Sequence, residues 1–478
     1  MTRHVASGCL RYGTAGAGRL LFSIYLNTIP RPYREPLEPW TGFGNGVLVP
    51  HPAPPPAADA RGPDFSGYQK FVVAVLAFLQ FTIVLDFMLL APLGAIVTPA
   101  LRITPGQFGD VVSAYAFAAG VSGIAAAGFA DRFDRKKLLL VFYTGFMAGT
   151  LCCALAHTYV TLLLARMVTG LFAGVVGAAS MAIITDLFPL SMRGRVMGFV
   201  QTAFAASTVL GLPLALVLSS RWNWNAPFFM VFAVCSAVGV AIFSRLRPVN
   251  AHLALHPDRH PLHHLLHTLR ERSYLIGFVT TAMLTVGGFL LMPYSTLFIV
   301  HNLGIPVEHL SLVYLVTGLV SAVMGPLIGR ASDAFGKFRV FVFGCVATIV
   351  MVLVYTRLSN VGLWMLIVVS ALLQIGIFSR MISSSALMSA LPRPADRGAY
   401  MSISSSLQQM SGGLAAMLGG MVVKEAGDGR LLHFDVLGDV LVCTTLLSLA
   451  LMYFVNRRVR GAVASPAAGL QAKAAGES

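Results

Sequence analysis

The sequence predicts an all-α integral membrane protein with twelve transmembrane helices in two pseudo-symmetric bundles of six. Of its 478 residues, 56% are hydrophobic and only 11% are charged, whereas soluble proteins carry about 25% charged residues. Nearly uncharged runs recur along the chain, and each is long enough to cross a bilayer as a helix of about 20 residues. The runs lack the alternation that the strands of a membrane barrel show.

Residues 1–67 are predicted to be a disordered extension, because stretches such as "RPYREPLEP" and "VPHPAPPPAADARGPD" are rich in Pro and Ala. Its weak apolar patch, "GRLLFSIYL", makes a poor signal peptide, since no cleavage site leads into a soluble domain. Two interpretations stay open. The extension is either a genuine disordered segment or an over-extended start of the reading frame.

Twelve apolar segments follow the extension, and a polar, basic stretch divides six from six. The predicted spans are 70–97, 109–130, 137–157, 159–188, 196–219, 226–246, 274–301, 309–329, 338–357, 361–391, 399–426 and 436–456. The predicted domains are an N-terminal bundle over 68–246, a cytoplasmic linker over 247–273, a C-terminal bundle over 274–456 and a cytoplasmic tail over 457–478.

Lys and Arg residues concentrate in alternate loops. The loops after predicted spans 2, 4, 8 and 10, the central stretch and the C-terminal tail hold 20 of the 34 bases. The loops on the opposite side hold five, namely Arg102, Arg221, Arg357, Lys424 and Arg430. Because basic loops stay in the cytoplasm, both termini and the linker are predicted to be cytoplasmic, in a bacterial inner membrane. This pattern explains the net charge of +15 without nucleic acid.

Two loop motifs occur in both halves of the chain. The turn "GFADRFDRKK" after span 2 matches "GRASDAFGKFRVF" after span 8, with Asp333 at the place of Asp131. The turn "PLSMRGRVMGF" after span 4 matches "PRPADRGAYMS" after span 10, with Arg397 at the place of Arg193. Such duplication at matched topology is typical of two parallel repeats around a central pathway.

These motifs resemble the major facilitator superfamily over roughly residues 68–456. The family's turn after span 2 reads Gly-x-x-x-Asp-Arg-x-Gly-Arg-Arg/Lys. In this chain Ala127 and Asp134 replace two of its glycines, whereas the second copy keeps Gly329 and Gly336. The stretches "LLLARMVTGLFAG" in span 4 and "LDFMLLAPLGAIV" in span 1 are also similar to the family, the latter to its arabinose- and drug-efflux-like members.

The region "VLGLPLALVLSSRWNWNAPFF" is similar to spans 5 and 6 of the drug:proton antiporter group, but Ala215 and Val217 replace the trailing glycines of its antiporter motif. The resemblance implies a secondary active transporter that exports a small organic molecule, such as a drug or sugar, against protons by alternating access. The first alternative is a proton-coupled uptake symporter or a uniporter of the same fold. The second is a non-transporting membrane sensor, which would normally need a soluble output domain.

The sequence holds no enzyme constellation and no Gly-x-x-x-x-Gly-Lys-Ser/Thr phosphate loop. We therefore do not expect an enzyme, an ATP-driven pump or a bound cofactor. We expect a monomer in the bilayer. The six histidines between His252 and His267 are spaced to share a helical face in part, but Pro257 and Pro261 interrupt it and no acid or thiol cluster completes a metal site. No metal is predicted.

Asp86 in span 1 is the most informative single residue. An acid at bilayer depth costs about 2.5–3.5 kcal/mol and almost always faces a cavity or a partner. A carboxyl group that is neutral or charged according to its surroundings can couple proton movement to a conformational change. Asp86 is therefore the candidate proton-coupling residue, and the alternative is a fixed partner for a buried arginine.

Arg166 in span 4 and Arg380 in span 10 are the only bases in the interior of predicted spans, away from their ends. Arg166 is a candidate to bind an anionic substrate group or to drive the proton off Asp86; the alternative is interhelical hydrogen bonding. Aligning "GLFAG" with "GIFSR" puts Arg380 opposite a glycine, which favours a role in substrate recognition. The remaining candidates for the substrate cavity, which could equally make ordinary interhelical hydrogen bonds, are Gln374, Gln408 and Gln409.

The resemblance implies that Asp131 lies near the N-terminus of span 11, where unpaired N–H groups favour a carboxylate by about 0.3–1 kcal/mol. A cytoplasmic gate is predicted here, a charged latch that holds the two bundles together in one access state. Its predicted members are Asp131, Arg132, Arg135, Asp186 and Asp333. The alternative is that these charges only mark the cytoplasmic side.

Overall fold

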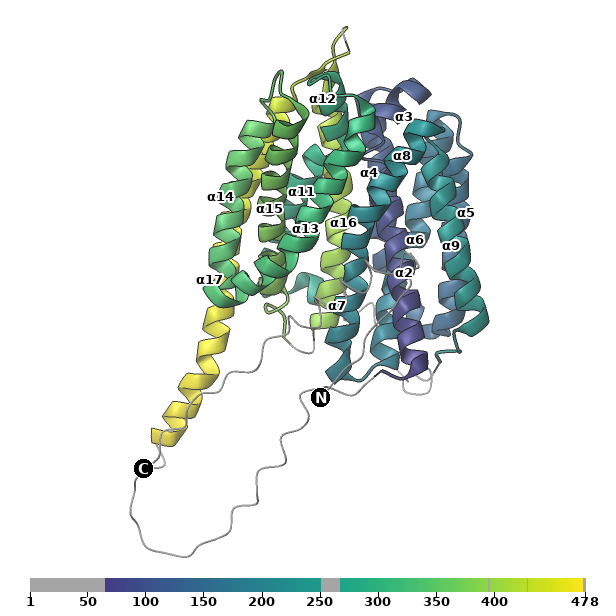
Figure 1. The fold of residues 1–478 in the computed structure, drawn as a ribbon. Helices are drawn as coiled ribbons and strands as arrows, with labels where there is room; N and C mark the ends of the chain where they lie inside the picture. Colours follow the sequence, from purple (N-terminus) through teal and green to yellow (C-terminus); the bar gives the residue numbers. More distant parts are fainter. Residues whose placement is uncertain (1–64, 251–266, 394–395, 428, 476–478) are drawn as a thin grey trace, which may run out of the picture. The chain divides into compact units, whose positions relative to one another are not determined.

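Helices account for nearly all of the described residues in the computed structural model, which are 65–250, 267–393, 396–427 and 429–475 (Figure 1). The first half of the chain forms α2 (Gly67–Leu89), α3 (Gly94–Leu101), α4 (Pro105–Phe129), η1 (Ala130–Arg132), α5 (Arg135–Ala154), α6 (Tyr159–Leu187), α7 (Leu190–Ala206), the π-helical η2 (Ser207–Gly211), α8 (Leu212–Arg221) and α9 (Ala226–Arg245).

The second half forms α11 (Arg272–Leu291), η4 (Met292–Tyr294), α12 (Ser295–His301), α13 (Val307–Phe335), α14 (Lys337–Tyr355), α15 (Leu363–Met388), α16 (Arg397–Val422), strands β1 (Lys424–Glu425) and β2 (Leu431–Leu432), and α17 (Phe434–Ala475). The tail predicted from residue 457 is helical through Ala475.

Local sequence signals explain several helix boundaries. Ser66, Thr104 and Thr158 each begin a helix with a capping box, in which the N-cap hydroxyl accepts from the third helical N–H. Pro92 lies in the turn that separates α2 from α3, and Pro293 lies in the 3-10 turn between α11 and α12. Because proline lacks an N–H, it interrupts the helical ladder at both places.

Eleven helical segments of the described residues are long and apolar enough to cross a membrane. The predicted eleventh span corresponds to α16, which has 26 residues but is not one of the eleven. Its sequence, "RGAYMSISSSLQQMSGGLAAMLGGMV", is rich in Ser, Gln and Gly. α16 packs against α4 and α11, so its polar and small residues meet other helices. The all-α architecture with membrane-length helices that the sequence predicts is confirmed.

The helix contacts repeat from one half to the other. In the first half α2 packs on α7 and α9, α4 on α6, and α5 on α6 and α9. In the second half α11 packs on α16 and α17, α13 on α15, and α14 on α15 and α17. When the spans are numbered in order, each pair of the first half has its counterpart six spans later. The halves meet through α4 with α16 and α8 with α13, which are also counterparts.

Glycines allow the close approach between the halves. A β-carbon added at Gly120 of α4 would lie 2.9 Å from the Ser406 carbonyl oxygen of α16. A β-carbon added at Gly318 of α13 would lie 3.0 Å from the Thr208 carbonyl oxygen of η2. Small residues of this kind let membrane helices pack backbone to backbone.

The central stretch begins in contact with the first half. The Arg135 N–H donates to the Val249 carbonyl oxygen over 3.0 Å, and the Arg247 N–H donates to the Tyr68 hydroxyl over 2.9 Å. The Lys136 ammonium donates to the Phe243 carbonyl oxygen over 3.0 Å. The residues after α9 are thus tied to the first turns of α2 and α5. The predicted linker continues outside the described residues over 251–266, which also contain five of its six histidines.

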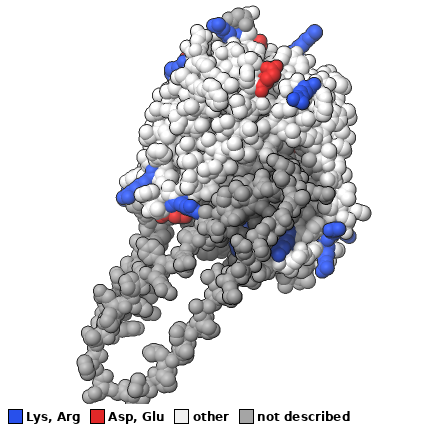
Figure 2. All heavy atoms as spheres, in the orientation of Figure 1, with Lys and Arg blue, Asp and Glu red and all other residues white. Residues whose placement is uncertain are grey.

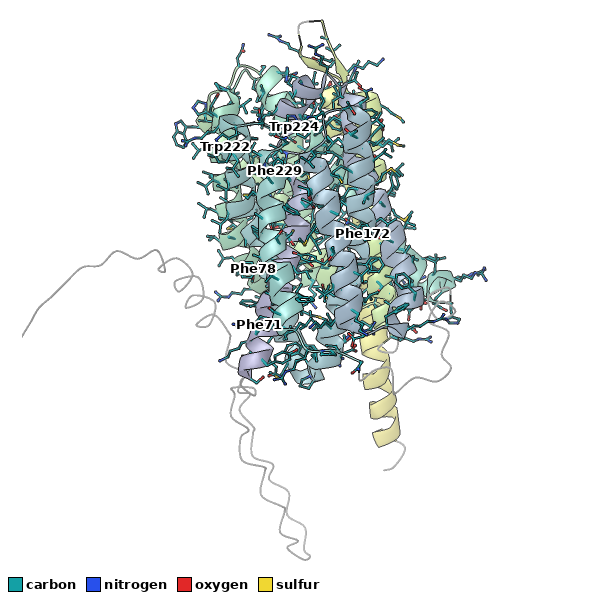
Figure 3. The ribbon with its side chains drawn as sticks, turned by 90° about the vertical axis from the view of Figure 1, so that its right-hand side faces the viewer. Phe71, Phe78, Phe172, Trp222, Trp224 and Phe229 are labelled. Atoms are coloured by element: carbon teal, nitrogen blue, oxygen red, sulfur yellow. The ribbon has the colours of Figure 1, made fainter. Side chains whose placement is uncertain are left out.

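The outside of the helices is apolar. On the face drawn in Figure 2, charged side chains lie toward the two ends, with an uncharged band between them. Figure 3, turned by 90° from Figure 1, shows aromatic side chains on another side of the helices, and Phe78 and Trp222 are 57% and 73% exposed. Exposed apolar surface of this extent suits contact with lipid.

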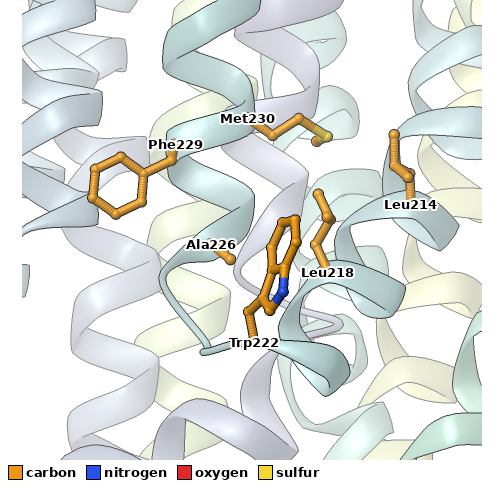
Figure 4. Close-up of a pocket in the computed structure, with 6 residues that line it drawn as sticks. All are labelled: Leu214, Leu218, Trp222, Ala226, Phe229 and Met230. Atoms are coloured by element: carbon orange, nitrogen blue, oxygen red, sulfur yellow. The ribbon is translucent and has the colours of Figure 1, made fainter.

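A shallow apolar groove lies between α8 and α9, where the Trp222 ring stands beside Leu218 (Figure 4). Its remaining lining residues are Leu214, Ala226, Phe229 and Met230. Because none of the six is charged, the groove suits lipid chains and offers no group for proton transfer.

Candidate functional site

Asp86 and Arg166 form an ion pair inside the first half. Asp86 lies near the C-terminal end of α2, and Arg166 lies in the third turn of α6. The Arg166 Nη1 donates to the Asp86 Oδ2 over 2.8 Å and to the Asp86 carbonyl oxygen over 3.1 Å. Both side chains are completely buried. Asp86 and Arg166 are therefore partners, which agrees with the buried arginine that the sequence left open as an alternative partner of Asp86.

Neighbouring helices complete the surroundings of this pair. The Thr150 hydroxyl of α5 donates to the Asp86 Oδ1 over 3.3 Å. The Arg166 guanidinium lies 4.3 Å from the centre of the Tyr115 ring of α4, a cation–π contact. Four helices thus supply the site.

The pair is not fully satisfied. The Nε and Nη2 of Arg166 and the Tyr115 hydroxyl are buried and have no hydrogen-bond partner among the described residues. A buried ion pair offsets its desolvation only when additional hydrogen bonds satisfy the remaining donors. The free donors therefore leave Arg166 able to take a second acceptor or to adopt another arrangement when Asp86 becomes neutral.

Aromatic rings connect this site to the second half. The ring of Phe87, the residue after Asp86, has its centre 5.4 Å from the centre of the Tyr115 ring and 5.6 Å from the centre of the Phe289 ring of α11. A displacement of α2 around Asp86 would therefore change the packing of Phe87 against α11.

Arg380 of α15 occupies a separate position, inside the second half. Its side chain is buried, with 6% exposure, and its Nη1 donates to the Thr445 hydroxyl of α17 over 2.9 Å. Its Nε is buried with no hydrogen-bond partner among the described residues. No carboxylate of the described residues forms an ion pair with it.

The three glutamines do not join either arginine. Gln374 and Gln409 are half-buried and Gln408 is exposed. None of the hydrogen bonds found among the described residues involves them. Their predicted place in a substrate cavity stays a prediction.

The predicted cytoplasmic gate is brought together in part. The Arg135 Nε lies 3.0 Å from the Asp186 Oδ2, and the Arg135 Nη1 donates to the Ala130 carbonyl oxygen over 2.9 Å. This pair joins α5 to α6 within the first half. Arg132 and Asp333 are exposed. The side chain of Asp131 lies outside the described residues, so the predicted latch between the halves stays a prediction.

The structure explains why the two copies of the turn differ at one glycine. Asp134 has φ −56°, and its carboxylate accepts from the Lys136 and Lys137 N–H groups at 2.8 and 3.1 Å, capping α5. Gly336, its counterpart before α14, has φ +96°. Because only glycine adopts such a φ without strain, the second copy requires glycine while the first can use a capping acid.

Sequence reasoning missed Tyr294, which lies in the turn between α11 and α12. Its hydroxyl donates to the Ala416 carbonyl oxygen of α16 over 2.5 Å and lies against Gly109 of α4. Beside it, the Thr296 hydroxyl donates to the Ala91 carbonyl oxygen over 3.0 Å, joining α12 to the turn before α3. These contacts connect the halves at the predicted outer end. Pro293 and the glycines of spans 2 and 11 were the available signals.

Solved transporter structures share this fold. A bacterial homologue of the human lysosomal transporter Spinster, in an inward-facing and occupied conformation, superposes with a TM-score of 0.62 at 16% identity, covering 83% of this chain and 98% of the homologue. A variant of the nucleoside transporter NupG superposes with a TM-score of 0.65 at 14% identity, covering 80% and 99%.

Curated relatives are similar over part of their length. An uncharacterised MFS-type transporter of Bacillus subtilis, YceJ, is 27% identical over 270 residues, 56% of this chain and 68% of its own. A chloramphenicol efflux pump of Mycobacterium tuberculosis is 26% identical over 278 residues, 57% of this chain and 65% of its own. A probable sugar efflux transporter of Helicobacter pylori is 21% identical over 58% and 72% of the respective chains. The chain thus spans about two thirds of the length of these relatives.

The family model of the Major Facilitator Superfamily matches residues 76–294 and 277–476. These two stretches contain both copies of the repeated turn and the buried residues Asp86, Arg166 and Arg380. With the repeated helix contacts and the shared fold, the match leads to one conclusion: this multi-pass membrane protein belongs to the Major Facilitator Superfamily of transporters.

Proposed function

We propose that the protein is a secondary active exporter, which exchanges protons for a small organic molecule by alternating access. The observation that carries this proposal is the buried pair of Asp86 and Arg166, with its hydrogen bond of 2.8 Å and no exposed surface on either side chain. Efflux as the direction draws support from the relatives that are named as chloramphenicol and sugar efflux proteins.

The proposed coupling follows from charge balance. When Asp86 is ionised, it neutralises Arg166 and holds α2 to α6. A proton on Asp86 would remove that attraction and leave a guanidinium without a counterion in a medium of low dielectric, which is costly. The helices would then favour an arrangement in which Arg166 finds another acceptor. Proton binding would therefore bias the balance between two conformations, as secondary coupling requires.

Alternating access in this proposal uses the contacts between the halves. At the predicted outer end, Tyr294 and Thr296 link α11 and α12 to elements of the first half. Opening that end would break these contacts while the charged cytoplasmic turns come together. The proposal also places the chain as a monomer in a bacterial inner membrane, with both termini in the cytoplasm.

Transport assays in sealed vesicles test the proposal. The purified full chain is placed in vesicles with an imposed pH gradient and a pH-sensitive dye, and chloramphenicol and a panel of monosaccharides are the probes. We expect at least one probe to release protons and to accumulate uphill, and Asp86→Asn to abolish the uphill component. Uphill transport by Asp86→Asn would contradict the role given to Asp86. Transport driven by the substrate gradient alone would instead identify a uniporter.

A further inference from the structure

Arg380 is a buried cation for which the described residues supply no counterion. It lies on α15 with 6% exposure, the Thr445 hydroxyl is its hydrogen-bond partner, and its Nε has none. A guanidinium has five N–H donors in a fixed fork. A charge buried at membrane depth is costly unless it is paired, and such residues mark substrate or ion pathways.

The first half has an acid beside its buried arginine, and the second half has a glycine beside its own. In each half, the fourth span carries a buried arginine whose side chain approaches the first span of the same half. Asp86 lies six residues before Pro92, and Gly287 lies six residues before Pro293. A β-carbon added at Gly287 would lie 3.8 Å from the Arg380 Nη2. Gly287 therefore stands beside Arg380 at the repeat position of Asp86, whereas Arg380 itself aligns with Gly174, two turns along the fourth span from the position of Arg166.

We propose that Arg380 binds an anionic group of the transported molecule, a carboxylate or a phosphate, beside Gly287. The glycine leaves out the acid that would otherwise neutralise the guanidinium, and the planar fork of arginine suits two oxygens of one oxyanion. The Thr445 hydroxyl accepts from Arg380 and can donate its own hydrogen at this place. The Thr444 hydroxyl lies 2.9 Å from the same added β-carbon and donates to the Leu441 carbonyl oxygen. The inference rests on the proposed function and assigns the class of substrate.

Binding to the purified full chain tests the charge requirement. Benzoate and phenyl phosphate are the anionic probes, and benzamide is the neutral match for benzoate. A ligand that binds the native state raises the unfolding temperature. We expect an anionic probe at about 10 mM to raise it and benzamide not to. Because a hydrogen bond to a charged group contributes about 1.5–3 kcal/mol, Arg380→Gln should weaken the binding at least about tenfold.

A substitution at Gly287 gives a matched control within the chain. Gly287→Asp would place a carboxylate beside Arg380, so it should prevent binding of the anionic probe. Gly287→Asn has nearly the same size and the same crowding against Thr444 but no charge, so it should keep more of the binding. In addition, Gly287→Asp should unfold at a higher temperature than Gly287→Asn when Arg380 is present, and this difference should disappear or reverse in the Arg380→Gln background.

Three outcomes would overturn the inference. They are no stabilisation by either anionic probe, equal stabilisation by benzamide, and stabilisation by chloride or inorganic phosphate as strong as by the organic anions. Transport separates this failure from that of the proposed function. If Arg380→Gln still moves phenyl phosphate uphill while Asp86→Asn does not, the exporter stands and its substrate is not held by Arg380.

Discussion

Tyr294 fills the space beside Gly109 that any larger residue at position 109 would need. A β-carbon at Gly109 would meet the Tyr294 hydroxyl and would lie 2.8 Å from the Ala416 carbonyl oxygen. The same hydroxyl donates to that carbonyl. The turn after α11 is therefore held between α4 and α16, one helix from each half, at the predicted outer end.

Gly109→Ala is expected to weaken this outer contact by about 1–3 kcal/mol, because the methyl group overpacks a filled space. The variant should expose the outer end more often, measured as faster reaction of a cysteine introduced at Thr296 with a membrane-impermeant thiol reagent added outside. Gly177→Ala in α6 is the control, since a β-carbon there meets no atom within 4 Å. Equal labelling rates in both variants would contradict a role of Tyr294 in outer closure.

The pair of Asp86 and Arg166 should behave as one unit in stability measurements. Removing either partner, by Asp86→Asn or Arg166→Gln, leaves a buried charge or its donors unpaired and is expected to cost about 3–5 kcal/mol. The double variant should cost clearly less than the sum of the two. Thermal unfolding of the four proteins in detergent gives the coupling energy, and additive effects would count against the pair. Thr150→Val, which loses one hydrogen bond, should cost only about 1 kcal/mol.

The two copies of the cytoplasmic turn should respond differently to the same residues. Asp134→Ala removes the cap of α5 and is expected to lower stability by about 0.5–2 kcal/mol, whereas Asp134→Gly should cost only a few tenths. Gly336→Ala should cost about 1 kcal/mol or more, because φ +96° is strained for alanine. Unfolding temperatures of the three variants test this order. A Gly336→Ala protein as stable as the wild type would show that this turn relaxes without glycine.

Topology can be measured at the same two positions. In a background without native cysteines, Cys introduced at Asp134 and at Gly336 should react with an impermeant thiol reagent from the same side of the membrane, the cytoplasmic one. Reaction from opposite sides would contradict the predicted orientation and the parallel repeat. A cysteine at Trp222 is the matched control. This exposed residue directly follows the last turn of α8, at the predicted outer end of span 5, and it should react from outside.

Much of the fold could be predicted because membrane spans are marked by composition and loop charge. Asp86, Arg166 and Arg380 stood out for a related reason, since charges are rare within spans. A pairing of Asp86 with a buried arginine was among the alternatives that the sequence left open. The Thr445 partner of Arg380 could not be predicted, because contacts between helices depend on packing that one sequence does not record. Tyr294 and Gly109 were missed because aromatic and small residues are abundant in every span. The polarity of α16 could not be interpreted from the sequence, because it is explained by the packing of this helix against α4 and α11.

The repeated helix contacts have an evolutionary consequence. The same five pairs of helices touch in each half, although Asp86 in one half corresponds to Gly287 in the other. Packing of the duplicated unit does not depend on an internal acid at that position. A lineage could therefore keep its ion coupling in one copy and alter its choice of cargo in the other, without having to redesign the scaffold that both copies share.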